Sequence, residues 1–133
     1  MPLTKKALLA LLIAALSIPT TAKSSTANIE YVSSILWSKA YDLKIAGDYA
    51  YCAFLNGLVI LDISDKRKPE FVSRLFLGGG FDVDSKESLV FVAAGKKGLK
   101  IVDVSDIKTP TLRGSYDTPG ESRDVAIKGD YAF

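Results

Sequence analysis

Residues 57–65 read GLVILDISD, and residues 98–106 read GLKIVDVSD, 41 positions further along the chain. The two segments have the same order of apolar and polar residues. The match continues at the same offset to Pro69 and Pro110. A segment that returns with this fidelity indicates a chain built from structural repeats.

Two further matches extend the repeat in both directions. Residues 30–33 (EYVS) correspond to residues 70–73 (EFVS) at an offset of 40, and residues 129–133 (GDYAF) reproduce residues 47–51 (GDYAY). A period near 41 therefore persists over three junctions and covers residues 30–133.

Within one period the apolar residues form short runs that are rich in β-branched and aromatic side chains. No run reaches the ~10–12 residues of a typical helix. Gly47-Asp48 and Asn56-Gly57 separate successive runs and suit tight hairpins, because Gly, Asn and Asp tolerate positive φ. We therefore predict a four-stranded antiparallel meander, with strands at residues 42–46, 49–55, 58–63 and 71–77.

The third run indicates how these units pack. Residues 58–61 (LVIL) are apolar at successive positions, so both faces of this strand need cover. A sheet sandwiched between two similar sheets meets that need, as blades do in a β-propeller. The predicted fold is all-β, a β-propeller of four-stranded blades.

The two GLxIxDxSD segments, with the strands before them and the Pro after them, resemble LVIVD repeats. That family has repeats of roughly 42 residues, found mainly in exported or surface-associated bacterial and archaeal proteins and assigned to β-propellers. The resemblance covers residues 30–133 and implies a fold and a location, but no single activity. We expect a lone closing strand at 30–37, blades at 42–77 and 82–117, and the start of another at 124–133.

Residues 1–22 have the features of a signal peptide. Lys5 and Lys6 precede a 12-residue apolar run at residues 7–18, and small residues up to Ala22 allow cleavage before Lys23. A membrane anchor is the competing interpretation, but 12 residues give only ~18 Å of helix against a ~30 Å hydrocarbon core. We predict an exported protein with a polar spacer at 23–29 and no membrane span after signal removal.

A propeller closes with about 4 to 8 blades, which is roughly 165 to 330 residues at this period. We therefore expect these residues to be the N-terminal fragment, about two and a half blades, of a longer protein that supplies the missing blades. An oligomer that completes the ring is the alternative. In the closed ring, the strand at 30–37 would join the last blade.

Charge and composition narrow the partners. Without Lys5 and Lys6, the 17 Lys and Arg fall to 15, equal to the 15 Asp and Glu, so we expect no nucleic-acid partner. The chain contains no His, which excludes Ser-His-Asp and Cys-His pairs from this stretch. Cys52 has no internal disulfide partner. It corresponds to Val92 in the repeat, so we interpret it as a buried strand residue, with an interchain disulfide as the alternative.

The strand-ending carboxylates Asp62 and Asp103 are each followed by Ser-Asp, at residues 64–65 and 105–106. Oxygen donors suit hard cations, so a cation loop is one interpretation. Turn chemistry, in which Asp and Ser side chains accept backbone N–H groups, is the one we favour.

Asp42, Asp82 and Asp124 recur at the start of the first strand of each unit. First strands are innermost in a propeller, so these carboxylates could form a ring that holds a cation at the channel mouth. Local capping of the strand is the alternative. We assign no catalytic, cofactor-binding or metal-ligating residue from the sequence, and whether this series binds a cation stays open.

Two other segments look functional but have structural explanations. Residues 78–80 (GGG) lack the Lys-Ser/Thr and the helix of a phosphate loop, so we predict a loop between blades. The basic run at 66–68 corresponds to IKT at 107–109, which favours a solvated turn.

The sequence thus predicts an exported, non-catalytic propeller that presents loops and blade edges to a protein or cell-envelope partner. The alternative is an enzyme or a ligand- or cation-binding propeller, with its site in the central channel and completed by other blades.

Overall fold

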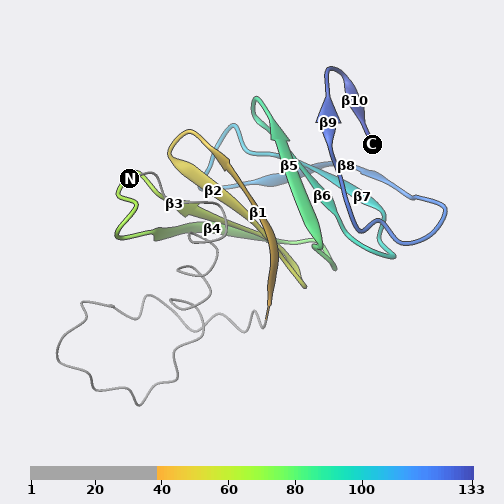
Figure 1. Ribbon diagram of the computed structural model, residues 1–133, viewed down its shortest axis with the longest axis horizontal. Coiled ribbons are helices and arrows are strands. Elements are labelled where there is room, and N and C mark those ends of the chain that lie inside the picture. The colour runs from red at the N-terminus through yellow and green to blue at the C-terminus, as the bar shows by residue number, and fades with distance from the viewer. Residues whose placement is uncertain (1–38) are drawn as a thin grey trace, which may run out of the picture.

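The computed structural model of the protein describes residues 39–133 (Figure 1). The signal peptide, the polar spacer and the closing strand at 30–37 that the sequence predicts lie outside these residues. Every regular element between residues 39 and 133 is a β-strand, as the sequence predicts.

The first repeat forms one antiparallel sheet, here called sheet 1. Its strands are β1 (Ala40–Ala46), β2 (Tyr49–Phe54), β3 (Gly57–Asp62) and β4 (Glu70–Phe76), hydrogen-bonded in that order. This confirms the predicted meander. The strands differ from prediction by one or two residues at their ends. Ala40 pairs with Phe54, for example, so backbone pairing in β1 starts before the apolar run does.

The second repeat forms sheet 2 with the same order. Its strands are β5 (Asp82–Lys86), β6 (Leu89–Ala93), β7 (Leu99–Asp103) and β8 (Thr111–Tyr116). A short hairpin follows, formed by β9 (Ile127–Lys128) and β10 (Tyr131–Ala132). In Figure 1 the hairpin lies beside sheet 2, on the side away from sheet 1.

Strand β3 of sheet 1 is buried on both faces, as its apolar sequence predicts. Leu58, Val59, Ile60 and Leu61 are between 0% and 4% exposed. One face belongs to a cluster of its own, which includes Leu43, Cys52 and Val59. Burying a side chain of this size contributes about 1.5–3 kcal/mol, so β3 is a major source of stability.

The other face of sheet 1 packs on sheet 2. We call it the covered face; it consists of Tyr51, Ala53, Leu58 and Ile60. It contacts the valine face of sheet 2, which consists of Val83, Val90, Val92 and Val102. Large side chains of one repeat thus lie on small β-branched side chains of the next.

The opposite face of sheet 2 is formed by residues at the same repeat positions as those of the covered face of sheet 1. Phe91 pairs with Ile101 across β6 and β7, just as Tyr51 pairs with Ile60 across β2 and β3. We call this surface the open face; it consists of Leu89, Phe91, Leu99 and Ile101. All four side chains are half-buried.

The loop at residues 78–80 joins the two sheets, as predicted. A Cβ added at Gly79 would meet the backbone of Ala94, and one added at Gly80 would meet the carbonyl oxygens of Phe54 and Gly57. The backbone at Gly79 and Gly80 therefore lies too close to its neighbours for a side chain, and Gly78 has a positive φ of 73°, so all three glycines are explained without a phosphate ligand.

Candidate functional site

The first strands of the two sheets, β1 and β5, and the segment before β9 bring together the carboxylates Asp42, Asp82 and Asp124, which recur in the sequence. β1 lies against β5, and β5 lies against β9. The side chains of Asp42 and Asp124 lie close enough to that of Asp82 on β5 to raise its pKa. Asp42 lies within β1 and Asp82 opens β5, but Asp124 precedes β9, which begins at Ile127. The expectation that Asp124 opens a strand is therefore wrong. The backbone N–H of the next residue, Val125, donates instead to Asp82 Oδ2 at 2.9 Å.

The pKa of Asp82 is raised to about 7. Burial is the main cause, because removal from water disfavours the ionised form, and the hydrogen bonds with Asp42 and Asp124 and the charge of Asp42 act in the same direction. The hydrogen bond from Val125 opposes the shift. With its pKa near 7, the Asp82 carboxyl exchanges its proton in the neutral pH range, where ordinary carboxyl groups are fully ionised.

The cluster has oxygen donors of the kind that hard cations prefer. However, among residues 39–133 no group of three or more His, Cys, Asp or Glu side chains is arranged to hold a metal ion. One oxygen of Asp82 already accepts the backbone N–H of Val125.

Asp84, two residues further along β5, contacts residues of the repeats before and after its own. It was not among the candidate residues predicted from the sequence. Its carboxylate lies 2.6 Å from Lys44 Nζ on β1 and accepts the backbone N–H of Ile127 at 2.8 Å. Burial alone would raise the pKa of Asp84, but these hydrogen bonds and the charge of Lys44 lower it. Lys44 and Asp84 occupy the same position in successive repeats. Their opposite charges at equivalent positions were the feature of the sequence that could have predicted this ion pair.

The strand-ending carboxylates hold turns, which confirms the interpretation that we favoured. Asp62 Oδ1 accepts the backbone N–H of Ser64 at 2.8 Å, and Asp103 Oδ1 accepts that of Ser105 at 2.9 Å. Hydrogen bonds from the Ser side chain and backbone lower the pKa of both carboxyls. Asp103 also pairs with Arg113 at 3.0 Å.

The next carboxylate in each turn, three residues further along the chain, also accepts the backbone N–H of the residue two positions after it. Asp65 Oδ1 accepts the backbone N–H of Arg67 at 2.9 Å, and Asp106 Oδ1 accepts that of Lys108 at 3.0 Å. The basic run at 66–68 is therefore an exposed turn fixed by Asp65.

Within the described residues, no helix is both long and apolar enough to cross a membrane.

Cys52 lies in β2 and is 1% exposed. Burial is the main cause that raises the pKa of its thiol to about 12, and the charge of Asp42 adds to the shift. The thiol is therefore an inert packing group, as its correspondence to Val92 suggested, and it is not accessible for an interchain disulfide.

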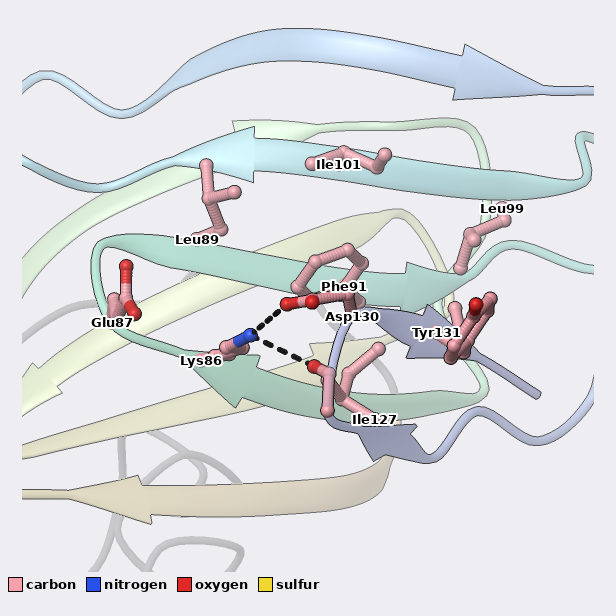
Figure 2. A pocket seen from close by; sticks show the side chains of 11 residues that line it. Lys86, Glu87, Leu89, Phe91, Leu99, Ile101, Ile127, Asp130 and Tyr131 are labelled. Carbon is pink, nitrogen blue, oxygen red and sulfur yellow. Dashed lines mark hydrogen bonds and ion pairs between the residues drawn. The ribbon is translucent and has the colours of Figure 1, made fainter.

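A pocket of about 370 Å³ lies between the open face and the β9–β10 hairpin. Figure 2 shows Phe91, Leu99 and Ile101 along its apolar wall, with Ile127 and Tyr131 opposite. At one end, Lys86 Nζ bonds to Asp130 Oδ1 and to the carbonyl oxygen of Gly129, each at 2.8 Å. No pattern in the sequence predicts this pocket, because the curvature between a sheet and the next hairpin does not follow from a repeat pattern.

A comparison with protein-family models matches residues 38–75, 79–118 and 119–133 to the LVIVD repeat. The chain belongs to the LVIVD repeat family. The three matched segments correspond to sheet 1, sheet 2 and the segment that ends in the β9–β10 hairpin. The resemblance stated from the sequence is confirmed, and the stacked sheets form a propeller-type repeat domain. No curated protein and no solved structure matches the chain.

Proposed function

We propose that this LVIVD protein is an exported, non-catalytic scaffold that presents its loops and sheet edges to a partner protein or to the cell envelope. The proposal has two parts, a location and a mechanical role. Each part has its own support and its own experiment.

One observation carries the mechanical role: the carboxylates on the strand ends and inner strands support the fold. Asp62 and Asp103 fix the exits of β3 and β7, and Asp84 ties β5 to β1 and to the segment that enters β9. Asp62, Asp84 and Asp103 are poor general bases, because the hydrogen bonds that they accept within the fold stabilise the ionised form and lower the pKa of each. Their arrangement suits a rigid support.

Export is supported by the sequence at the N-terminus. Lys5 and Lys6, the apolar run at 7–18 and the small residues before Lys23 are the three parts of a secretory signal. Membership in a repeat family whose members are mostly exported agrees with this assignment.

Cell fractionation of the full chain tests the location. We expect the protein outside the cytoplasm, with a mass that corresponds to a new N-terminus at Lys23. The matched control replaces Leu11→Arg and Leu12→Arg, which interrupts the apolar run and should leave the uncleaved chain inside. A full-length chain in the cytoplasm of both strains contradicts export.

Protease treatment of intact cells tests the role at the surface. The exposed turn at 66–68 offers Lys and Arg to trypsin, whereas the equivalent turn at 107–109 offers only Lys108. A surface scaffold should be cut at these turns on intact cells. Protection on intact cells, with cleavage after the outer layer is opened, would restrict the proposal to an interior compartment of the envelope.

A further inference from the structure

We propose that Asn56 is a site of spontaneous deamidation and that its isoaspartyl product loosens the junction between sheets 1 and 2. Asn56 lies in the turn between β2 and β3, at the opposite end of β3 from the turn that Asp62 holds. The modification does not depend on the scaffold role proposed above.

The sequence after Asn56 favours this reaction. The backbone nitrogen of the residue after an asparagine can attack the side-chain amide and close a succinimide ring. The attack meets least hindrance when that residue is glycine, because glycine has no side chain beside its nitrogen. Asn56 precedes Gly57, whereas Asn28, the other asparagine of the chain, precedes the branched residue Ile29. The chain has no glutamine, so Asn56 is the favoured position.

The fold leaves the side-chain amide of Asn56 accessible. Asn56 is exposed, and its neighbour Leu55 is 41% exposed. Among residues 39–133, no hydrogen bond holds the Asn56 side chain. Gly57 is the first residue of β3 and pairs with Phe54 at the end of the hairpin. The ends of strands open more readily than their middles, so the Gly57 nitrogen becomes available without unfolding of the sheet.

The reaction needs only water as a co-reactant. In the first step a bond forms between the Gly57 nitrogen and Cγ of Asn56. The bond from Cγ to Nδ2 breaks, and the amide nitrogen leaves as ammonia with the proton that the Gly57 nitrogen has lost. Water then opens the ring. Attack at Cγ gives aspartate, whereas attack at the main-chain carbonyl carbon of Asn56 gives isoaspartate.

Two hydrogen bonds in the structure favour the second product. The main-chain carbonyl oxygen of Asn56 accepts the backbone N–H groups of Leu77 and Gly78, at 3.0 and 3.3 Å. Donors at a carbonyl oxygen stabilise the negative charge that develops there when water attacks. The fold therefore directs water to the main-chain carbonyl, and isoaspartate forms.

The isoaspartyl product should disturb the junction because the backbone there is tightly packed. The product lengthens the main chain before Gly57 by one carbon, about 1.5 Å. A Cβ added at Gly57 would lie 2.2 Å from the carbonyl oxygen of Leu75, and one added at Gly80 would lie 2.7 Å from that of Gly57. Gly57 therefore cannot move without displacing the loop at 78–80, which joins the two sheets.

Peptide mapping of the purified full chain tests the site. The chain is incubated at pH 8 and at pH 5, below its melting transition, and then digested with trypsin. Residues 45–66 form one tryptic peptide, which contains Asn56, and residues 24–39 form another, which contains Asn28. We expect the first peptide to gain the mass that replaces Asn with Asp, faster at pH 8, because the attacking nitrogen must lose its proton. The second peptide should stay unchanged.

The chain unfolded in guanidinium chloride is the reference for the effect of the fold. If the folded chain stays unmodified over a time in which the unfolded chain reacts, the fold protects Asn56 and the proposal is overturned. Chromatography separates the aspartyl and isoaspartyl peptides. The isoaspartyl fraction should be higher in the folded chain, and equal fractions would overturn the role of the bonds from Leu77 and Gly78.

Two variants test the consequence for the junction. The parent chain should lose several degrees in melting temperature as it reacts, and the amide hydrogens of Leu77 and Gly78 should exchange faster. Asn56→Lys introduces the residue that the second repeat has at this position, Lys97, and should keep its melting temperature throughout. Asn56→Asp adds the charge without lengthening the main chain and should melt close to the fresh parent. An unchanged melt of the reacted parent would overturn the effect on the junction, and a melt of Asn56→Asp as low as that of the reacted parent would overturn the longer main chain as its cause.

Discussion

The covered face of sheet 1 and the open face of sheet 2 are formed by equivalent positions of the repeat, but they have different neighbours in the molecule. Ile60 and Ile101 occupy equivalent positions in β3 and β7 and pair with aromatic residues in the same register. Ile60 is fully buried, whereas Ile101 is half-buried. The difference lies in the neighbour: sheet 2 covers one face, and a two-stranded hairpin lies over part of the other.

This difference shows where the stability of a stacked repeat originates. Apolar burial contributes roughly 25 cal/mol per Å² removed from water, so a side chain contributes in full only when the next unit is in place. In such arrays the interfaces between units matter as much as the units themselves. Equivalent residues should therefore make unequal contributions to stability.

The largest expected effect comes from truncating the two isoleucines. Ile60→Ala should lower the free energy of unfolding by about 3–4 kcal/mol, since it leaves a cavity between two packed sheets. Ile101→Ala should lower the free energy of unfolding by only about 1 kcal/mol, because water already reaches the open face. Urea denaturation of each variant and of the parent chain measures the difference.

Equal losses at Ile60 and Ile101 would contradict the comparison, because they would mean that the open face is as well packed as the covered one.

The next effect concerns the loop that brings sheet 2 onto the covered face. Gly80→Ala should destabilise the chain by about 2–3 kcal/mol, because the new Cβ would lie 2.7 Å from the carbonyl oxygen of Gly57. Gly114→Ala is the matched control, since its Cβ would meet only the Ile101 side chain, at 3.8 Å. Thermal melts of both variants provide the measurement, and a harmless Gly80→Ala would mean that the loop has room to move.

Much of this fold follows from the sequence, because its causes are local and repeated. The short apolar runs determine the strands, and the Gly-Asp and Asn-Gly pairs between them determine the hairpins. The apolar run at 58–61 requires cover on both of its faces. The turn bonds of Asp62 and Asp103 were predictable for the same reason. Each carboxylate reaches a backbone N–H only two residues away.

The site was less predictable, because its contacts join residues about 40 positions apart. The pair of Lys44 and Asp84 depends on how far β1 slides along β5, which no local pattern specifies. The pocket depends on the angle at which the β9–β10 hairpin leaves sheet 2. The proximity of Asp42, Asp82 and Asp124 was anticipated from the repeat, but the raised pKa of Asp82 depends on burial that only the packed sheets produce.

A smaller effect should appear in the pH dependence of stability. The pKa of Asp82, about 7 in the folded chain, lies above the ordinary value of a carboxyl group. The folded chain therefore keeps a proton that the unfolded chain releases above pH ~4, and stability should fall as pH rises from ~4 to ~7. Solvent screening limits the change to about 1 kcal/mol.

Asp82→Asn should flatten this pH profile, because the amide keeps an acceptor for Val125 and cannot ionise. Urea denaturation at pH 5 and at pH 8 gives the comparison. Asp117→Asn, which removes an exposed carboxylate after β8, is the control and should leave the slope intact. A slope that survives Asp82→Asn would assign the titration to another group.

The smallest expected effect is a gain at the hairpin that borders the open face. Glu87 has a φ of 54°, whereas the same turn position holds Gly47 in the first repeat and Gly129 in the third, both at φ 60°. A left-handed conformation costs a residue with a side chain about 1–2 kcal/mol, part of which the greater flexibility of unfolded glycine offsets. Glu87→Gly should therefore stabilise the chain by about 0.5 kcal/mol, a rise of a few degrees in melting temperature. Gly47→Ala imposes the same strain on the first hairpin and should lower the melting temperature. If Glu87→Gly destabilises the chain instead, the Glu87 side chain makes a contact at the rim of the pocket that outweighs the strain, and the open face is better covered than its exposure indicates.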